Sequence, residues 1–162
     1  MDFVHDYLAD GRRLRTLNIV DAFTRECLAI EVDTSLPSAR VVRVLDRLVW
    51  ELGLPESLRV DNGPEFISMT LDRWAFQHGV LLDFTRPGKP TENGFVESFQ
   101  GRFRDECLNA EIFHDLEDAK RKIHAWRDDY NRRRPHSALG NLSPREYLRR
   151  WYSEARSKKP IL

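Results

Sequence analysis

The chain has 162 residues, of which 41% are hydrophobic and 32% are charged, and its formal net charge is zero. This length is sufficient for one domain with its own core. The composition excludes an intrinsically disordered chain, and no apolar run approaches the ~18 residues of a membrane-spanning helix. The two cysteines, Cys27 and Cys107, belong to no CxxC pair, which argues against a disulfide framework or a cysteine zinc site. Because the N-terminal sequence lacks the basic and apolar regions of a secretory signal, we expect a cytoplasmic protein.

Charge is distributed unevenly along the chain. Residues 1–85 carry 9 Lys/Arg and 14 Asp/Glu, a net charge of −5, whereas residues 86–162 carry 17 and 12, a net charge of +5. An acidic half can hold a cation and a basic half can hold a polyanion. Charge alone is equally consistent with two solvated surfaces, which is the more common case.

The first half of the chain has the patterns of strands and then of alternating helices and strands. Alternating apolar residues predict strands at residues 3–7, 14–21, 27–32, 58–60 and 80–84. Short links between the first three strands predict an antiparallel meander. Helical spacing of apolar residues predicts two helices, one from Pro37-Ser38 to Gly53 and one over residues 68–78 that ends at Gly79.

The second half is predicted to be helical. A loop at 85–90 contains two prolines and a glycine, and Thr91 can cap a long helix over residues 92–108. Two more helices are expected at 116–133, where Pro135 ends the pattern, and from Ser143 to about residue 155. The order of elements predicts an α/β fold in which helices cover both faces of a mixed five-stranded sheet, with three antiparallel strands followed by parallel ones.

Three carboxylates stand where a site is expected. Asp61 directly follows a short strand, at the carboxyl end where such sheets bind ligands, although Asp61-Asn62-Gly63 also has the composition of a simple turn. Asp2 opens the first strand, where an uncompensated carboxylate is unfavourable unless a cation balances it. The alternative for Asp2 is a frayed terminus.

The third carboxylate, Glu97, lies on the predicted 92–108 helix. Asn93, Glu97, Gln100 and Arg104 form one polar stripe, and Val96, Phe99 and Phe103 form an apolar stripe beside it. We therefore expect Glu97 at the edge of the buried face, looking into a crevice, with an ordinary exposed glutamate as the alternative. Three carboxylates suit hard divalent cations, and two such ions can flank a scissile phosphate. The five histidines show no zinc spacing, and the chain has no P-loop.

In this order, five segments resemble the catalytic core of bacterial insertion-sequence transposases of the OrfB type, which are similar to retroviral integrases. The segments are MDFVHD (1–6), LNIVDAFTRECLAIEV (17–32), RVDNGPEF (59–66), FTRPGKPTENGFVESFQGRFRDECLN (84–109) and YNRRRPHSALGNLSPREY (130–147). Asp61 and Glu97 are separated by 35 residues, the interval of the D,D-35-E group. Asp2, Asp61 and Glu97 match the three acidic positions of this family.

The resemblance implies an RNase H-like fold, two Mg²⁺ or Mn²⁺ ions held by Asp2, Asp61 and Glu97, and DNA as the substrate. It also implies strand cleavage at the ends of an element and transfer of the 3′-hydroxyl to target DNA, without a covalent protein intermediate. We expect a catalytic core at residues 1–110, a helical extension of the same domain at 111–156 and a loose tail at 157–162. A homo-oligomer, an association with an upstream helix-turn-helix protein or domain, and a location at the bacterial nucleoid are implied as well.

Other acids and a set of basic residues complete the prediction. Glu92, Asp6, Asp21 and Glu65 are weaker candidates for the acidic site, and Asp21 has a structural alternative. The residues expected to contact DNA come mainly from the basic half: Lys89, Asn93, Gln100, Arg102, Arg104, Arg132, Arg133, Arg134 and His136. Such groups bind phosphates without reading sequence. The run around Arg132 can equally be a helix C-terminus with favourable cations.

The resemblance departs from the family pattern at the start of the chain. Asp2 is already the first acidic position, whereas family members have an upstream region, often a helix-turn-helix, that recognises the element ends. We therefore expect a fragment that binds Mg²⁺ and nonspecific DNA and transposes poorly by itself. Two alternatives remain: a non-catalytic fragment that binds DNA or co-assembles with full-length transposase, and an RNase H-like nuclease that only hydrolyses.

Overall fold

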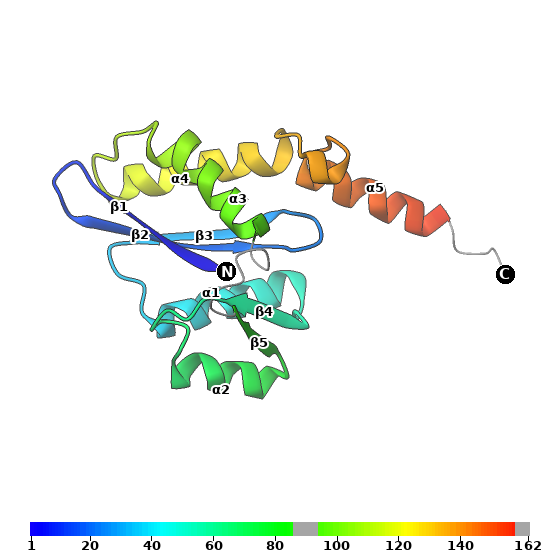
Figure 1. Ribbon diagram of the computed structural model, residues 1–162, viewed down its shortest axis with the longest axis horizontal. Coiled ribbons are helices and arrows are strands. Elements are labelled where there is room, and N and C mark those ends of the chain that lie inside the picture. Colours follow the sequence, from blue (N-terminus) through cyan, green and yellow to red (C-terminus); the bar gives the residue numbers. More distant parts are fainter. Residues whose placement is uncertain (86–93, 158–162) are drawn as a thin grey trace.

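A computed structural model describes residues 1–85 and 94–157 of the chain (Figure 1). Its first sheet contains β1 (Asp2–Tyr7), β2 (Arg13–Val20) and β3 (Cys27–Asp33), all antiparallel. In this register Asp2 lies opposite Asn18, and Asn18 lies opposite Ile30. The predicted meander is confirmed. Its first turn contains Gly11 at a φ of 84°, a left-handed conformation that glycine adopts without a steric penalty.

The next segment forms a βαβ unit preceded by a helix. Helix α1 (Ser38–Leu52) leads to β4 (Ser57–Val60), and α2 (Met69–His78) connects β4 to the parallel strand β5 (Leu81–Phe84). The side chain of Ser68 caps α2 by accepting a hydrogen bond from the Leu71 N–H at 3.2 Å. These elements agree with the sequence pattern, because the caps and stops that define them are local.

The single five-stranded sheet that we expected is not formed. Within the described residues the strands make a three-stranded sheet and a separate two-stranded sheet, β4–β5. The amino group of Met1 links them by donating a hydrogen bond to the Arg59 carbonyl at 2.6 Å. Because β1 begins at Asp2, and among the described residues no ladder joins it to β4. The α/β class and the antiparallel-then-parallel strand order are as predicted.

The last part of the chain contains α3 (Gly94–Phe103), a π-helical turn η2 (Arg104–Leu108), α4 (Leu116–Arg132), a short 3-10 turn η3 (Ser137–Leu139) and α5 (Pro144–Ser157). The predicted helix at 92–108 is therefore not α-helical to its end, and its residues 92–93 lie outside the described ranges. The wider turn brings both Cys107 and Leu108 into the buried face.

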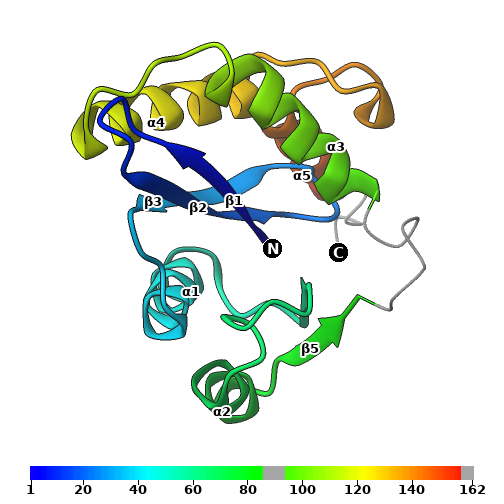
Figure 2. The ribbon, with the colours of Figure 1, turned by 60° about the vertical axis from the view of Figure 1, so that its left-hand side comes forward.

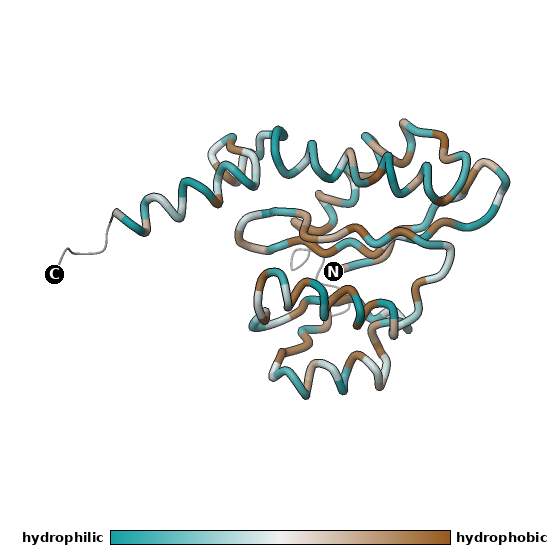
Figure 3. Tube along the Cα trace, turned by 180° about the vertical axis from the view of Figure 1, so that it is seen from behind, coloured by the Kyte–Doolittle hydropathy of each residue, from teal (hydrophilic) through white to brown (hydrophobic). Residues whose placement is uncertain are grey.

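Helices cover the first sheet on both sides, and two hydrophobic clusters fill the space between them. Figure 2 shows α3 and α4 on one side of β1–β3 and α1 on the other. Phe99, Phe103 and Ile123 belong to the cluster under α3 and α4, whereas Leu45 and Phe66 belong to the cluster on the α1 side. Hydrophobic residues follow the strands and the inner helix faces, and α5 projects away from the body of the molecule (Figures 1 and 3).

Two side chains of α4, the buried Asn131 and the half-buried Arg127, attach this helix to β3. The Asn131 amide accepts a hydrogen bond from the Cys27 N–H at 2.8 Å and donates one to the Cys27 carbonyl at 2.9 Å. Arg127 donates to the same carbonyl at 2.8 Å and to the Leu28 carbonyl at 2.5 Å. These bonds satisfy backbone groups at the edge of the sheet. Helix α4 therefore packs as part of the core, and the amide of Asn131 and the guanidinium group of Arg127 take the place of a neighbouring strand.

Candidate active site

Asp2 occupies the beginning of β1, on the face of the sheet that α3 covers. Its Oδ1 accepts a hydrogen bond from the Phe3 N–H at 2.6 Å. Burial raises the pKa of this carboxyl group, and the nearby negative charge of Asp61 raises it further. The fold therefore brings Asp2 and Asp61, which are far apart in the sequence, close enough for their charges to repel each other.

Asp61 follows β4 and belongs to a tight turn. Its Oδ1 accepts a hydrogen bond from the Gly63 N–H at 2.9 Å. A side chain at position 63 would place its Cβ 2.9 Å from the same oxygen, so this carboxylate position requires a glycine there. Asp61-Asn62-Gly63 can therefore be both a turn and the position of a ligand-binding carboxylate, since the turn itself holds the Asp61 carboxylate near β1.

Glu97 lies in the first turns of α3, and its side chain is exposed. Val96 and Phe99 take the buried positions around it, which agrees with the alternative of an ordinary exposed glutamate, and its role as a metal ligand stays a prediction. One turn further along, the Gln100 side chain lies close to Asp2, where it opposes the rise in the Asp2 pKa. In the described ranges no three Asp, Glu, His or Cys side chains come close enough to share an ion. The structure therefore brings two of the three predicted acids together.

Buried polar atoms without partners lie around Asp2. Asn18, directly across from Asp2 in the register, is fully buried, and neither its Nδ2 nor its Oδ1 has a hydrogen-bond partner among the described residues. The buried Nε2 of Gln100 lacks one as well. Unsatisfied buried groups are rare and costly, and they are often found at functional sites. Two carboxylates and an amide oxygen are hard donors, so these residues fit a divalent cation of the Mg²⁺ type.

We predict that Asn18→Leu stabilises the protein. Leucine has the same number of side-chain heavy atoms, branched at the same position, and it removes a buried amide that forms no hydrogen bonds, so the free energy of unfolding should rise by about 1–2 kcal/mol. Urea denaturation of the wild type and the variant measures this change. Asn131→Leu serves as the matched control, because that buried asparagine does form hydrogen bonds and its loss should destabilise the protein. A decrease for Asn18→Leu would contradict the prediction.

The weaker acidic candidates have structural roles or lie apart. Asp21 caps the β2–β3 hairpin turn, where its Oδ1 accepts hydrogen bonds from the Thr24 N–H at 2.6 Å and the Thr24 hydroxyl at 2.7 Å. Glu65 forms an ion pair with Arg15 at 2.6 Å. Asp6 shares the sheet face of Asp2 at the far end of β1. Glu92 lies outside the described residues.

The residues predicted to contact DNA differ in their surroundings. Lys89 and Asn93 lie outside the described residues. Arg104, Arg132 and Arg133 are exposed. Arg132 lies 3.9 Å from Asp128, and Arg133 lies 3.7 Å from Asp129. Arg134 is half-buried and forms an ion pair with Glu106, so its charge is already balanced.

His136 is buried, with 5% of its surface exposed. Burial lowers its pKa to about 4, and the positive charges of Arg102, Arg134 and Arg25 lower it as well. The Nη1 of Arg102 lies 3.5 Å from the His136 Nδ1. His136 is therefore neutral at pH 7 and lies in the interior beside α3, and its contact with DNA stays a prediction.

This lowered pKa predicts acid sensitivity. Between pH 6.5 and 4 the unfolded chain binds a proton at His136 that the folded protein does not, so the free energy of unfolding falls as the pH decreases. We expect His136 to contribute about 2–3 kcal/mol of this loss between pH 7 and 4.5. Urea denaturation at both pH values measures it. The loss should shrink by that amount in His136→Asn and remain in the exposed-histidine control His114→Asn; an equal loss in all three proteins would contradict the prediction.

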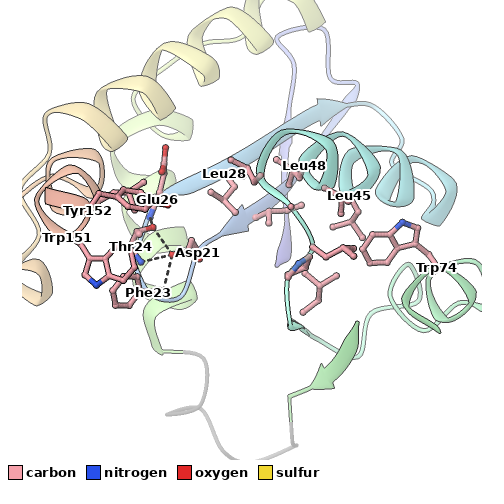
Figure 4. A pocket seen from close by; sticks show the side chains of 18 residues that line it. Asp21, Phe23, Thr24, Glu26, Leu28, Leu45, Leu48, Trp74, Trp151 and Tyr152 are labelled. Carbon is pink, nitrogen blue, oxygen red and sulfur yellow. Dashed lines mark hydrogen bonds between the residues drawn. The ribbon is translucent and has the colours of Figure 1, made fainter. Parts of the chain in front are cut away.

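A separate apolar cavity of about 580 Å³ lies away from the acids. It is bordered by the β2–β3 hairpin, the end of α1 and helix α5, with Phe23, Leu48 and Trp151 among its lining residues (Figure 4). Its acidic lining residues are Asp21 and Glu26, and none of Asp2, Asp61 and Glu97 lines it. Among the described helices, none is long and apolar enough to cross a membrane.

Sequence comparison identifies related proteins over almost the entire chain. Two family models described as integrase core domain match residues 1–90 and 78–144. An uncharacterized 31.7 kDa protein of insertion element IS407 from Burkholderia multivorans is 50% identical over 147 residues, which are 91% of this chain and 53% of the relative. The transposase InsF for insertion sequence IS3A of Escherichia coli is 24% identical over 132 residues, 80% of this chain and 46% of the relative. This chain thus spans about half the length of these relatives.

Solved structures share the fold at low sequence identity. The HTLV-2 integrase catalytic core domain in complex with magnesium matches with a TM-score of 0.67 and 15% identity, covering 90% of this chain and 94% of that one. The catalytic core domain of BIV integrase matches with a TM-score of 0.66 and 17% identity, covering 95% and 96%. The arrangement of strands and helices is therefore an RNase H-like fold, as the resemblance predicted.

Proposed function

Because this chain belongs to the integrase core domain family, we propose that it is the catalytic core of an insertion-sequence transposase, which cleaves and joins DNA by divalent-metal-dependent phosphoryl transfer. The fold and the relatives support a polynucleotidyl transferase. The proposed substrates are the DNA ends of an insertion element and a target DNA.

The observation that carries this proposal is the meeting of Asp2 and Asp61 at the junction of the two sheets. The repulsion between the two carboxylates and the unpaired amide oxygen of Asn18 beside them both favour a bound cation. Asp2, Asp61 and Glu97 would hold two Mg²⁺ or Mn²⁺ ions. Such ions, when bound, activate the attacking oxygen and stabilise the leaving oxygen of an in-line displacement.

The residues of the chain orient the carboxylates. The N–H groups of Phe3 and Gly63 each donate to one carboxylate oxygen, which leaves the second oxygen of Asp2 and of Asp61 available to a ligand. Gln100, on the helix that carries Glu97, lies beside Asp2 and would couple the position of α3 to that of β1. Preorganised carboxylates of this kind supply positioning and charge neutralisation, and phosphoryl transfer needs little more from the protein.

The proposed reaction has two chemical steps. Water first displaces the 3′ oxygen of the element end from its phosphate, which leaves a 3′-hydroxyl. This hydroxyl then attacks a phosphate of the target DNA, and the target's own 3′ oxygen leaves. No protein side chain forms a covalent bond in either step.

DNA would run along the basic residues beside this site. Lys89, Asn93, Gln100, Arg102 and Arg104 would contact the strand that is cut. The exposed arginines at the end of α4, Arg132 and Arg133, extend this surface, and Arg134 and His136 support it from the interior. These contacts are nonspecific, because guanidinium and amide groups bind phosphates in any sequence.

The active assembly is proposed to be a homo-oligomer. The solved core of HTLV-2 integrase exists in a dimeric and a trimeric form. We further propose that recognition of specific element ends comes from an upstream helix-turn-helix protein or domain, and that the protein acts at the bacterial nucleoid.

The direct test uses a labelled duplex oligonucleotide and a supercoiled target plasmid. We expect strand cleavage in Mg²⁺ or Mn²⁺ but not in EDTA. We also expect the labelled strand to be joined to the plasmid in the presence of either ion. A pre-cleaved duplex whose transferred strand ends in a 3′-deoxynucleotide should not be joined, because the attacking hydroxyl is missing. Cleavage without joining would indicate an RNase H-like nuclease. The absence of both cleaved and joined products would indicate a non-catalytic fragment.

A further inference from the structure

A small cavity of about 180 Å³ lies between the β2–β3 hairpin, the start of α3 and the segment after α4. Its polar lining consists of Arg25, Ser98, Arg102, Tyr130, His136 and Ser137. Within residues 1–85 and 94–157, no acidic side chain lines it. Its volume is below that of sites for drug-sized ligands, which begin at about 300 Å³, and it suits a single oxyanion.

The two arginines bring uncompensated positive charge to this cavity. Neither Arg25 nor Arg102 forms an ion pair with a carboxylate among the described residues, whereas the neighbouring Arg134 is balanced by Glu106. Arg25 lies over the ring of Phe95 at 4.6 Å from its centre, so its stem is held against α3. Figure 2 shows the first turn of α3 beside the end of the β2–β3 hairpin, the arrangement that this contact requires.

His136 brings to this cavity a buried ring nitrogen that has no hydrogen-bond partner among the described residues. The ring is 5% exposed, and its Nε2 has no hydrogen bond to any described residue. Since Arg102 can only donate, the Nδ1 of His136 must accept in their 3.5 Å contact, and the neutral ring then carries its hydrogen on Nε2. The cavity is therefore lined by an imidazole donor that lacks an acceptor, together with two guanidinium groups.

The backbone at Arg25 is a further sign of selection for its side chain. Arg25 has a φ of 62°, the left-handed region that glycine and asparagine occupy more readily. The turn would form more easily with either of those residues. An arginine at this position is explained if its guanidinium group has a task that the backbone conformation does not require.

We propose that this cavity binds a phosphate oxyanion through the guanidinium groups of Arg25 and Arg102 and the imidazole of His136. The hydroxyl of Tyr130, which forms no hydrogen bond within the described part of the chain, and those of Ser98 and Ser137 provide further donors on the lining. Paired guanidinium groups are the usual recognition elements for phosphate oxygens. The phosphate is either a DNA phosphodiester, which rests on the proposed function, or a free phosphate group.

The first arm of the test follows the Arg25 and Arg102 Nε–H and His136 imidazole signals in ¹H–¹⁵N spectra during titration with inorganic phosphate, in EDTA. We expect these signals to shift with phosphate but not with the same concentration of chloride. Arg25→Asn, which tolerates the left-handed backbone, and Arg102→Gln should each weaken phosphate binding about 10-fold. Arg43→Gln, at an exposed arginine of α1, is the matched control and should leave it unchanged.

The second arm measures affinity for a duplex oligonucleotide as a function of salt. If the phosphate is a DNA phosphodiester, Arg102→Gln should lower the slope of log K against log salt by about 1, whereas Arg43→Gln should not. Phosphate binding with an unchanged slope supports the site and assigns it to a free phosphate. If phosphate causes no specific shift and the slope does not change, in variants with wild-type melting curves, the proposal is overturned. Because both arms omit divalent ions, loss of metal-dependent cleavage would not affect them.

Discussion

Asp61→Asn should lower divalent-metal-dependent strand cleavage by about 10²–10³-fold. A metal ligand supplies several kcal/mol of transition-state charge stabilisation, and asparagine removes the negative charge while its Oδ1 can still accept from the Gly63 N–H. The same change removes the charge that helps to raise the Asp2 pKa. The folded protein without metal should therefore be at least as stable as the wild type. The measurement is the initial rate of cleavage of a labelled duplex in Mg²⁺, paired with a melting curve in EDTA.

Two comparisons make this result specific to the site. Glu51→Gln, on the exposed surface of α1, removes one negative charge elsewhere and should leave the rate unchanged. Asp2→Asn should resemble Asp61→Asn in both rate and melting temperature. If Asp61→Asn and Glu51→Gln cleave at the same rate, the pair of acids is not the catalytic centre, whatever the fold.

The Asn131→Ala variant should lose about 2–4 kcal/mol of its free energy of unfolding. The substitution removes two buried hydrogen bonds to Cys27 and leaves the Cys27 N–H without an acceptor inside the protein. The Cys27 carbonyl retains its bond from Arg127, which limits the loss. Urea denaturation at neutral pH gives the value directly.

The neighbouring arginine provides the control for Asn131. Arg132→Ala changes an exposed side chain on the same helix turn, and surface substitutions of this kind usually alter stability by less than about 0.5 kcal/mol. If the two variants are equally stable, the amide of Asn131 does not hold α4 to β3.

The resemblance grouped Asn131 with the basic run that follows it, and the structure separates these residues. Asn131 is buried against β3, Arg134 is paired with Glu106, and only Arg132 and Arg133 are fully exposed. A linear motif contains no information on which of its members face a sheet edge. That distinction arises because α4 lies on β3, about 100 residues away in the chain.

The polar residue Asn18 illustrates a signal that sequence reasoning passed over. It interrupts the apolar run Leu17, Ile19 and Val20 of β2, a position at which an amide is unfavourable unless it has a partner. Its importance becomes visible only when the register places it across from Asp2. The sequence also contained no sign of the left-handed conformation of Arg25, because an arginine in a turn does not indicate a positive φ.

What the sequence determined by itself is local. The bounds of α1, α2 and the strands follow from apolar periodicity and from caps and stops such as Ser68, Gly53 and Gly79, since these act over a few residues. The order of the elements was enough for the α/β class. The 35-residue interval between Asp61 and Glu97 was also readable, as part of a family resemblance.

Only the tertiary structure decided how distant segments meet. It divided the strands between two sheets, placed the Asp61 carboxylate beside Asp2, left Glu97 exposed on α3, and turned the end of the predicted 92–108 helix into a π turn. Each of these outcomes depends on packing and charge between residues that are far apart in the chain. Such long-range terms override local preference where the two compete, and no local pattern encodes them.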